Sequence, residues 1–317
     1  MSVRMAVEFE ETSMTSLIME KSLVSNNFTL SNQPERLGWL TPTDPHQPIG
    51  VLREQYEAQG YVWLKHLLDP DEVWDFRRRY FEALRPAGLV APGSDPREGI
   101  YAGGGEDKRL LTEKTVEIAR WAAYEAFCLA KPILNFYEAL FAEPVYLHKR
   151  MLIRHTRPGD PNCTGAHYDL VYLRAGTDQI CTSWIPIGDI PVEMGGLIYL
   201  EGSDGWGRTM EAEFSVKNAD LSPEERLSAY NRNMNEGGWL TKNVPELAER
   251  LNTRWLMADY EAGDMVVHSP YMIHASTMNE NAEGRMRLST DIRFQRASDR
   301  IDPRWQNHWR PDDEKKF

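Results

Sequence analysis

From Pro144 onward, the sequence consists of short β-like runs separated by turn signals, and this pattern restricts the fold more than any other feature. The turn signals include Pro158-Gly159-Asp160 and Gly195-Gly196. Short strands with such punctuation are typical of a β-sandwich or a barrel. The expected strands cover residues 145–154, 180–187, 196–200, 264–268 and 287–294.

The part before Pro144 has a more helical pattern. Residues 60–64 predict a first strand, and Asp69 then has the features of an N-cap, with Pro70 following at the first helical position. The basic run 77–79 within this helix is expected to face solvent. Two more helices are expected near 113–127 and 131–141. The chain is therefore predicted to be mainly β with flanking helices, an α+β architecture.

Two segments differ in character from the rest of the chain. Residues 1–48 are polar and predict an N-terminal extension, which is compatible with a contact in a homo-oligomer, and residues 49–317 are expected to form a single domain. A helical insertion interrupts the strands at about 205–256, with one helix capped at Ser222 and another starting near Pro245. We expect this insertion to be a substrate lid, and a surface elaboration is the alternative.

Composition excludes several classes of partner. The net charge of -12 argues against binding to nucleic acid or to an anionic membrane. No apolar run approaches the roughly 20 residues of a transmembrane helix, and the first 30 residues lack the apolar stretch of a secretory signal. The 3 cysteines include no CxxC pair, which argues against a disulfide framework or a thiolate zinc site. A cytoplasmic location is expected.

One histidine pattern suggests a metal site. Of the 8 histidines, only His167 has an acidic residue two positions later, in His167-Tyr168-Asp169. In a strand, alternation would place both side chains on one face, where they can chelate one divalent metal. A second histidine from a distant strand would complete a facial triad that leaves open positions on Fe(II). About one such pair is expected by chance in a chain of this composition, so the motif alone is a weak signal.

The surrounding motifs make the signal specific. After His167-Tyr168-Asp169, the chain continues with Trp184-Ile185-Pro186-Ile187, Gly195-Gly196-Leu197, His274-Ala275-Ser276 and Arg287-Leu288-Ser289, and closes with Arg293-Phe294. In this order, over roughly 50–296 without the insertion, the chain resembles the phytanoyl-CoA dioxygenase family of Fe(II)- and 2-oxoglutarate-dependent oxygenases. The resemblance implies a double-stranded β-helix, that is, a cupin-like jelly roll.

The resemblance also implies roles for individual residues. His167, Asp169 and His274 would be the iron ligands and thus the catalytic centre. Arg287 would pair with the distal carboxylate of 2-oxoglutarate, because a guanidinium group matches a carboxylate with two parallel hydrogen bonds. The remaining cosubstrate contacts would be Ser289, Met151, Trp184 and Ser276.

Two neighbouring residues compete with these assignments. Arg285 has the spacing from His274 that is usual in the family, and we expect it on the same strand face as Arg287, so parity does not separate the two. Arg287 is preferred because Arg-x-Ser and its distance to Arg293 fit the family strand. His268 is expected to be a partly buried structural histidine.

The expected activity is the hydroxylation of a small organic molecule, such as a specialised metabolite, with Fe(II), 2-oxoglutarate and O2. Desaturation, cyclisation or epimerisation would use the same ligands. Two other classes remain: a non-catalytic metal-binding jelly roll, and a cupin-like metalloenzyme that does not use 2-oxoglutarate. The Arg287-Leu288-Ser289 motif argues against both, because neither needs a carboxylate clamp.

Overall fold

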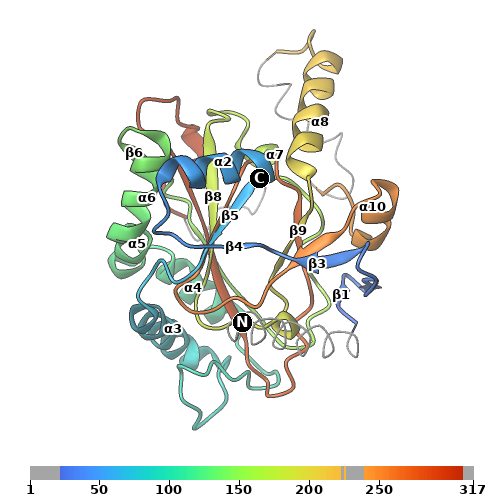
Figure 1. Cartoon of the computed structure of the whole chain (residues 1–317). Coiled ribbons are helices and arrows are strands. Elements are labelled where there is room, and N and C mark those ends of the chain that lie inside the picture. Colours follow the sequence, from blue (N-terminus) through green and yellow to red (C-terminus); the bar gives the residue numbers. More distant parts are fainter. Residues whose placement is uncertain (1–21, 223–224, 226–238, 310–317) are drawn as a thin grey trace, which may run out of the picture.

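The computed structural model describes residues 22–222, 225 and 239–309. Two β-sheets form the centre of the molecule, and most helices lie on the outer side of the larger sheet (Figure 1). The fold is the mixed α+β architecture that the sequence predicted. Among the described helices, none combines the length and the apolar character that a membrane crossing needs.

The larger sheet is built around one long strand, β13 (Arg287–Arg296), which pairs antiparallel with β8 over most of its length. On its other edge, β13 pairs with β6 and then with β7, so its residues contact strands from three parts of the chain. The other strands of this sheet are β4 (Pro42–Thr43), β5 (Tyr61–Leu64), β6 (Val145–Leu147), β7 (Leu152–Thr156), β8 (Ile180–Pro186) and β11 (Met265–His268).

The smaller sheet carries strand β12, and its order is β12-β9-β10-β3. It buries apolar residues against α10 and the hairpin of β1 and β2. Its strands and the hairpin strands are β1 (Val24–Ser25), β2 (Phe28–Thr29), β3 (Leu37–Trp39), β9 (Leu197–Leu200), β10 (Trp255–Met257) and β12 (His274–Ser276).

The described part of the N-terminal segment, residues 22–48, packs onto both sheets. Strand β3 adds to β10 in parallel, and β4 adds to β5 in parallel. Parallel addition by a polar segment requires partners that are distant in sequence, which explains why the alternation pattern did not reveal these strands.

Helices cover the outer face of the larger sheet with their apolar sides. Helix α3 (Pro70–Leu84) begins at Asp69, whose side chain accepts a hydrogen bond from the backbone N–H of Asp71, as the N-cap pattern predicted. Arg77 of this helix is 2% exposed and donates to carbonyl groups, so the expectation that the whole run 77–79 faces solvent was wrong. The other helices on this side are α2 (Ile49–Gln59), α4 (Lys108–Ile118), α5 (Ala122–Cys128) and α6 (Lys131–Phe141).

The segment predicted as a helical insertion, about 205–256, contains helices α8 (Ser203–Lys217) and α10 (Val244–Arg250) in its described part. Helix α8 projects away from the sheets (Figure 1), and α10 buries its apolar side in the second core. Ser222 and Glu225 exchange the two hydrogen bonds of a capping box, as expected, whereas the helix that would follow lies outside the described residues. Strand β10 begins at Trp255, near the end of this segment.

Candidate active site

Three side chains from separate elements meet in one buried cluster. His167, Asp169 and His274 each offer a ligand atom, and these atoms all lie within 4.8 Å of one another. The Nε2 atom of His167 lies 3.6 Å from Oδ1 of Asp169, and that of His274 lies 3.8 Å from the same oxygen. The three residues are 7%, 2% and 3% exposed, so the cluster is almost closed to bulk solvent.

The backbone brings these residues together in a way that differs from the strand we expected. His167 and His274 form an isolated antiparallel bridge, with each N–H donating to the carbonyl of the other residue. Asp169 has helical dihedral angles (φ -67°, ψ -28°) and stands at the start of the short helix α7 (Leu170–Leu173). The position of Asp169 beside His167 is therefore set by a turn that follows the bridge, and not by the strand alternation that we expected.

Backbone carbonyls fix the orientation of both histidine rings. Nδ1 of His167 lies 2.9 Å from the carbonyl oxygen of Gly165, and Nδ1 of His274 lies 3.0 Å from that of Met272. Because a carbonyl can only accept, each Nδ1 carries the proton and each Nε2 keeps a lone pair directed at the cluster. Burial, together with the two neighbouring histidines, holds the pKa of His274 well below its ordinary value. The neutral ring is the form that binds a metal.

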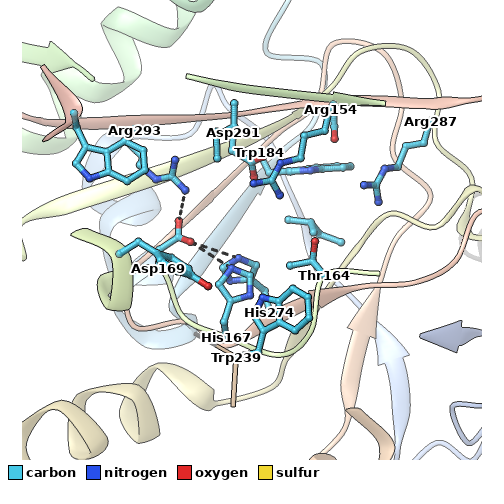
Figure 2. Close-up of a pocket in the computed structure, with 15 residues that line it drawn as sticks. Arg154, Thr164, His167, Asp169, Trp184, Trp239, His274, Arg287, Asp291 and Arg293 are labelled. Atoms are coloured by element: carbon cyan, nitrogen blue, oxygen red, sulfur yellow. Dashed lines mark hydrogen bonds and ion pairs between the residues drawn. The ribbon is translucent and has the colours of Figure 1, made fainter. Parts of the chain in front are cut away.

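The far oxygen of Asp169 is held by a row of residues that lie side by side on three strands. Thr182 on β8 pairs directly with Arg293 on β13 and with His268 on β11. The hydroxyl of Thr182 donates to Oδ2 of Asp169, and Nη2 of Arg293 lies 3.3 Å from the same atom. Burial acts to raise the pKa of Asp169, but the Arg293 guanidinium and the histidines hold it well below its usual range. Oδ1 is thus directed at the two imidazoles as a carboxylate oxygen (Figure 2).

His268 is more closely involved in the cluster than the sequence indicated. It is completely buried, not partly, and its Nε2 lies 3.6 Å from Oδ2 of Asp169. Its Nδ1 lies 3.2 Å from the hydroxyl of Tyr199. The sequence analysis did not assign Thr182, Arg293 and His268 to the site. The even spacing of Arg293 from Arg287 along one strand could have indicated that Arg293 faces the same cavity.

A cavity of about 300 Å³ opens beside the cluster. Four alternating residues of β13 line it, so one face of this strand forms a wall of the site. They are Arg287, Ser289, Asp291 and Arg293.

Arg287 is a buried cation whose hydrogen bonds are incomplete. It is 6% exposed, and Nη1 donates to the carbonyl of Gly195, while Nε has no hydrogen-bond partner among the described residues. Burial lowers its pKa to about 10. A buried guanidinium with unused donors suits an anionic ligand in the cavity.

Arg285 occupies a different position from the one we expected. It precedes β13, its side chain is 42% exposed, and it pairs with Glu98 and Glu283 at 2.9 Å each. The expectation that it shares the strand face of Arg287 was wrong, because the strand and its alternation begin only at Arg287. Arg285 lines a surface pocket away from the histidines.

The remaining expected cosubstrate contacts divide into three outcomes. Trp184 lines the cavity, as does Ser289. Met151 does not: it is 1% exposed in the core beneath the helices, because the cavity side of its segment belongs to the alternating positions Leu152 and Arg154. Ser276 borders an adjoining pocket that also reaches Arg287, and its hydroxyl accepts from the N–H of Thr164 at 2.9 Å.

Comparison with known proteins identifies the family. The family model described as phytanoyl-CoA dioxygenase (PhyH) matches residues 56–287. The chain belongs to the phytanoyl-CoA dioxygenase family. The resemblance seen in the sequence motifs is thereby confirmed, and the chain is an oxidoreductase of the oxygenase type.

Two curated relatives are hydroxylases. The 1-deoxypentalenic acid 11-beta-hydroxylases of Streptomyces arenae and Streptomyces exfoliatus are each 25% identical over 255 residues, which cover 78% of this chain and 81% of the relative.

Solved structures share the fold at lower identity. The epimerase SnoN from nogalamycin biosynthesis, solved with Fe3+, alpha ketoglutarate and nogalamycin RO, is 19% identical with a TM-score of 0.53, covering 82% of this chain and 88% of that one. EctD from S. alaskensis with bound Fe is 13% identical with a TM-score of 0.52, covering 90% and 93%. The predicted jelly-roll fold is confirmed.

The donor set fits an iron ion. Two imidazole nitrogens with free lone pairs and one carboxylate oxygen form the ligand set of non-haem Fe(II) oxygenases. The carbonyls behind the rings and the donors behind Asp169 are the outer partners that such ligands need. The site therefore meets the chemical requirements of the metal that the family uses.

Proposed function

We propose that the chain is an Fe(II)- and 2-oxoglutarate-dependent dioxygenase that hydroxylates a small organic molecule and releases succinate and CO2. The observation that carries this proposal is the presence of a His-Asp-His cluster and a buried, incompletely bonded arginine in one cavity. When bound, Fe(II) supplies open coordination positions at which O2 can be activated with the electrons of 2-oxoglutarate.

His167, Asp169 and His274 hold the metal in this proposal. The backbone carbonyls accept from Nδ1 of both rings and so direct Nε2 at the metal, and Arg293 with Thr182 keeps Asp169 ionised and leaves Oδ1 for the metal. Because these partners are fixed before the metal arrives, little reorganisation is needed on binding.

Arg287 and Ser289 bind the distal carboxylate of 2-oxoglutarate in this proposal. Both lie on the cavity face of β13, two residues apart, and Arg287 retains donors that no described residue uses. Trp184 contributes apolar surface to the same cavity and is itself buried.

Hydroxylation is preferred over the other outcomes because the curated relatives are named hydroxylases, whereas the epimerase SnoN shares only the fold. Asp169 completes the facial triad, which all of these outcomes require. Analysis of the product distinguishes hydroxylation from desaturation, cyclisation and epimerisation, which all start from the same site.

The substrate is a compact molecule with apolar surface, such as a specialised metabolite. Leu152, Leu197 and Trp239 line the cavity next to the ligand cluster. A cytoplasmic location belongs to the same proposal, and it is supported by the fact that Cys128, Cys163 and Cys181 are all buried free thiols.

Conversion of 2-oxoglutarate to succinate tests the function directly. The Fe(II)-loaded protein is incubated with 2-oxoglutarate and O2, and succinate is quantified with and without candidate substrates. Asp169→Ala should abolish the conversion, while Asp95→Ala, a change of the same type at an exposed turn outside the cavity, should not. Absence of succinate from the intact protein, even in the presence of substrates, would favour the non-oxygenase classes.

A further inference from the structure

Arg154 is a cation at the cavity that forms no ion pair with the described residues. It lies on β7 opposite Ser289 of β13, and it lines the same cavity as the metal cluster. Its guanidinium has no hydrogen-bond or ion-pair partner among the described residues. Its guanidinium is therefore available to an anionic group of a ligand in the cavity.

Arg154 and Arg287 occupy different depths. Arg287 is buried, whereas Arg154 is exposed to the open cavity. Figure 2 shows both guanidinium groups extending into the cavity from the wall opposite His167 and His274. The deeper arginine is the one assigned to 2-oxoglutarate, so a molecule that enters from solvent meets Arg154.

The charged residues that line the cavity have a net charge of one positive unit. The charged lining residues in the described part of the chain are Arg154, Arg287, Arg293, Asp169 and Asp291, three cations and two anions. Fe(II) and the 2-oxoglutarate dianion add charges that cancel each other. The loaded site therefore carries one excess positive charge, which a monoanionic ligand would neutralise.

The rest of the cavity is apolar. Leu152, next to Arg154 on the same strand face, and Leu197 provide aliphatic surface. Trp239 and Trp305 add aromatic surface. A ligand that fits this lining has a hydrocarbon body and one acidic group.

We propose that Arg154 binds the carboxylate of an apolar monocarboxylic acid and that this class of acid is the substrate. The proposal rests on the proposed oxygenase function. A guanidinium group binds a carboxylate with two hydrogen bonds, and this pairing orients the hydrocarbon body toward the metal ligands. A phosphate monoester would bring two negative charges to a site that has only one excess positive charge. Cationic ligands such as amines would be repelled by the excess positive charge.

The test compares acids with their own amides in the protein loaded with Fe(II) and 2-oxoglutarate without oxygen. Adamantane-1-carboxylic acid and decanoic acid are the probes, each paired with its primary amide, so that a compact and an extended body are both sampled. Binding is followed by tryptophan fluorescence, because Trp184, Trp239 and Trp305 line the cavity. The acids should bind at least about tenfold more tightly than the amides, as expected for a charge-assisted pair.

Two matched variants give the result its meaning. Arg154→Gln should remove the preference for acids, and Arg285→Gln, the same change outside the cavity, should retain it. Equal binding of acid and amide, no binding of either acid, or a preference that survives in Arg154→Gln would overturn the proposal.

A second readout separates this inference from the proposed function. Binding of 2-oxoglutarate alone is measured by the visible charge-transfer band of its Fe(II) complex, and Arg154→Gln should leave it unchanged. Loss of that band in Arg154→Gln would assign Arg154 to the cosubstrate and overturn the inference. A wild-type protein with no band would instead contradict the oxygenase function, whereas a band without a preference for acids would contradict only this inference.

Discussion

Replacing Arg293 with methionine removes the cation that stabilises Asp169. In the metal-free protein, Asp169 is 2% exposed and its far oxygen depends on Thr182 and on Arg293 at 3.3 Å. Breaking a buried pair by removing one partner costs about 3–5 kcal/mol, because it leaves an uncompensated charge. Thr182 retains its hydrogen bond, and the contact with Arg293 is a single one, so we expect about 3 kcal/mol, at the low end of that range.

The measurement is urea unfolding of the metal-free protein at neutral pH, followed by tryptophan fluorescence and circular dichroism. Arg285→Met is the control: its side chain is 42% exposed, and surface ion pairs contribute about 0–1 kcal/mol. The double variant Asp169→Asn/Arg293→Met should recover stability relative to Arg293→Met, because the unpaired charge is gone.

Two results would refute the reasoning. One is a decrease of less than about 1 kcal/mol in the free energy of unfolding of Arg293→Met, since the pair would then contribute no more than an ordinary surface ion pair. The other is a double variant as unstable as Arg293→Met, since Arg293 would then act only through packing, for example on Trp305, whose ring lies 5.0 Å from its guanidinium.

Two further predictions concern the support of the site and its pH dependence. Gly195 has φ 74°, its carbonyl accepts from Arg287, and an added Cβ would lie 2.4 Å from the carbonyl oxygen of Thr277. Gly195→Ala should lower the free energy of unfolding by about 2 kcal/mol and weaken 2-oxoglutarate binding. Gly205→Ala is the control and should do neither, because a Cβ added at Gly205 meets nothing within 4 Å. An unchanged urea midpoint in Gly195→Ala would contradict this prediction. Burial lowers the pKa of His148 to about 4, so below about pH 6.5 the unfolded chain takes up a proton that the folded chain does not, and stability falls as the pH drops from 6.5 toward 4. Between pH 7 and pH 5, this histidine should lower the free energy of unfolding by about 2 kcal/mol. Urea unfolding at the two pH values should therefore show a smaller loss of stability in His148→Gln than in the wild-type protein, and equal losses would contradict the assignment.

Several features of the site could be predicted from the sequence because they depend on local pattern. The cluster of His167, Asp169 and His274 was predicted from the family resemblance that the ordered motifs carry, and the strand from Arg287 was predicted from its β-like run after a turn. The helix start at Asp69 was also predictable, since a cap depends on neighbouring residues alone.

Other features depend on contacts between distant segments. The cross-strand row of His268, Thr182 and Arg293 requires the register of three strands, which spacing within one strand does not reveal. The resemblance placed Met151 at the cosubstrate pocket, whereas its side chain is buried in the core just before β7 begins at Leu152. Arg285 was expected on the strand face of Arg287, because the residue at which β13 begins could not be read from the sequence.

The central claim is that Arg287 holds 2-oxoglutarate beside an Fe(II) ion bound by the His-Asp-His cluster. Anaerobic titration of the protein with Fe(II) and 2-oxoglutarate, followed by the visible charge-transfer band of the chelated cosubstrate, tests it most directly. The account predicts a band in the wild-type protein and in Arg285→Ala, and a band lost at ordinary 2-oxoglutarate concentrations in Arg287→Ala, because a buried charge pair is removed. A wild-type protein without the band, or a band lost in Arg285→Ala and kept in Arg287→Ala, would contradict it.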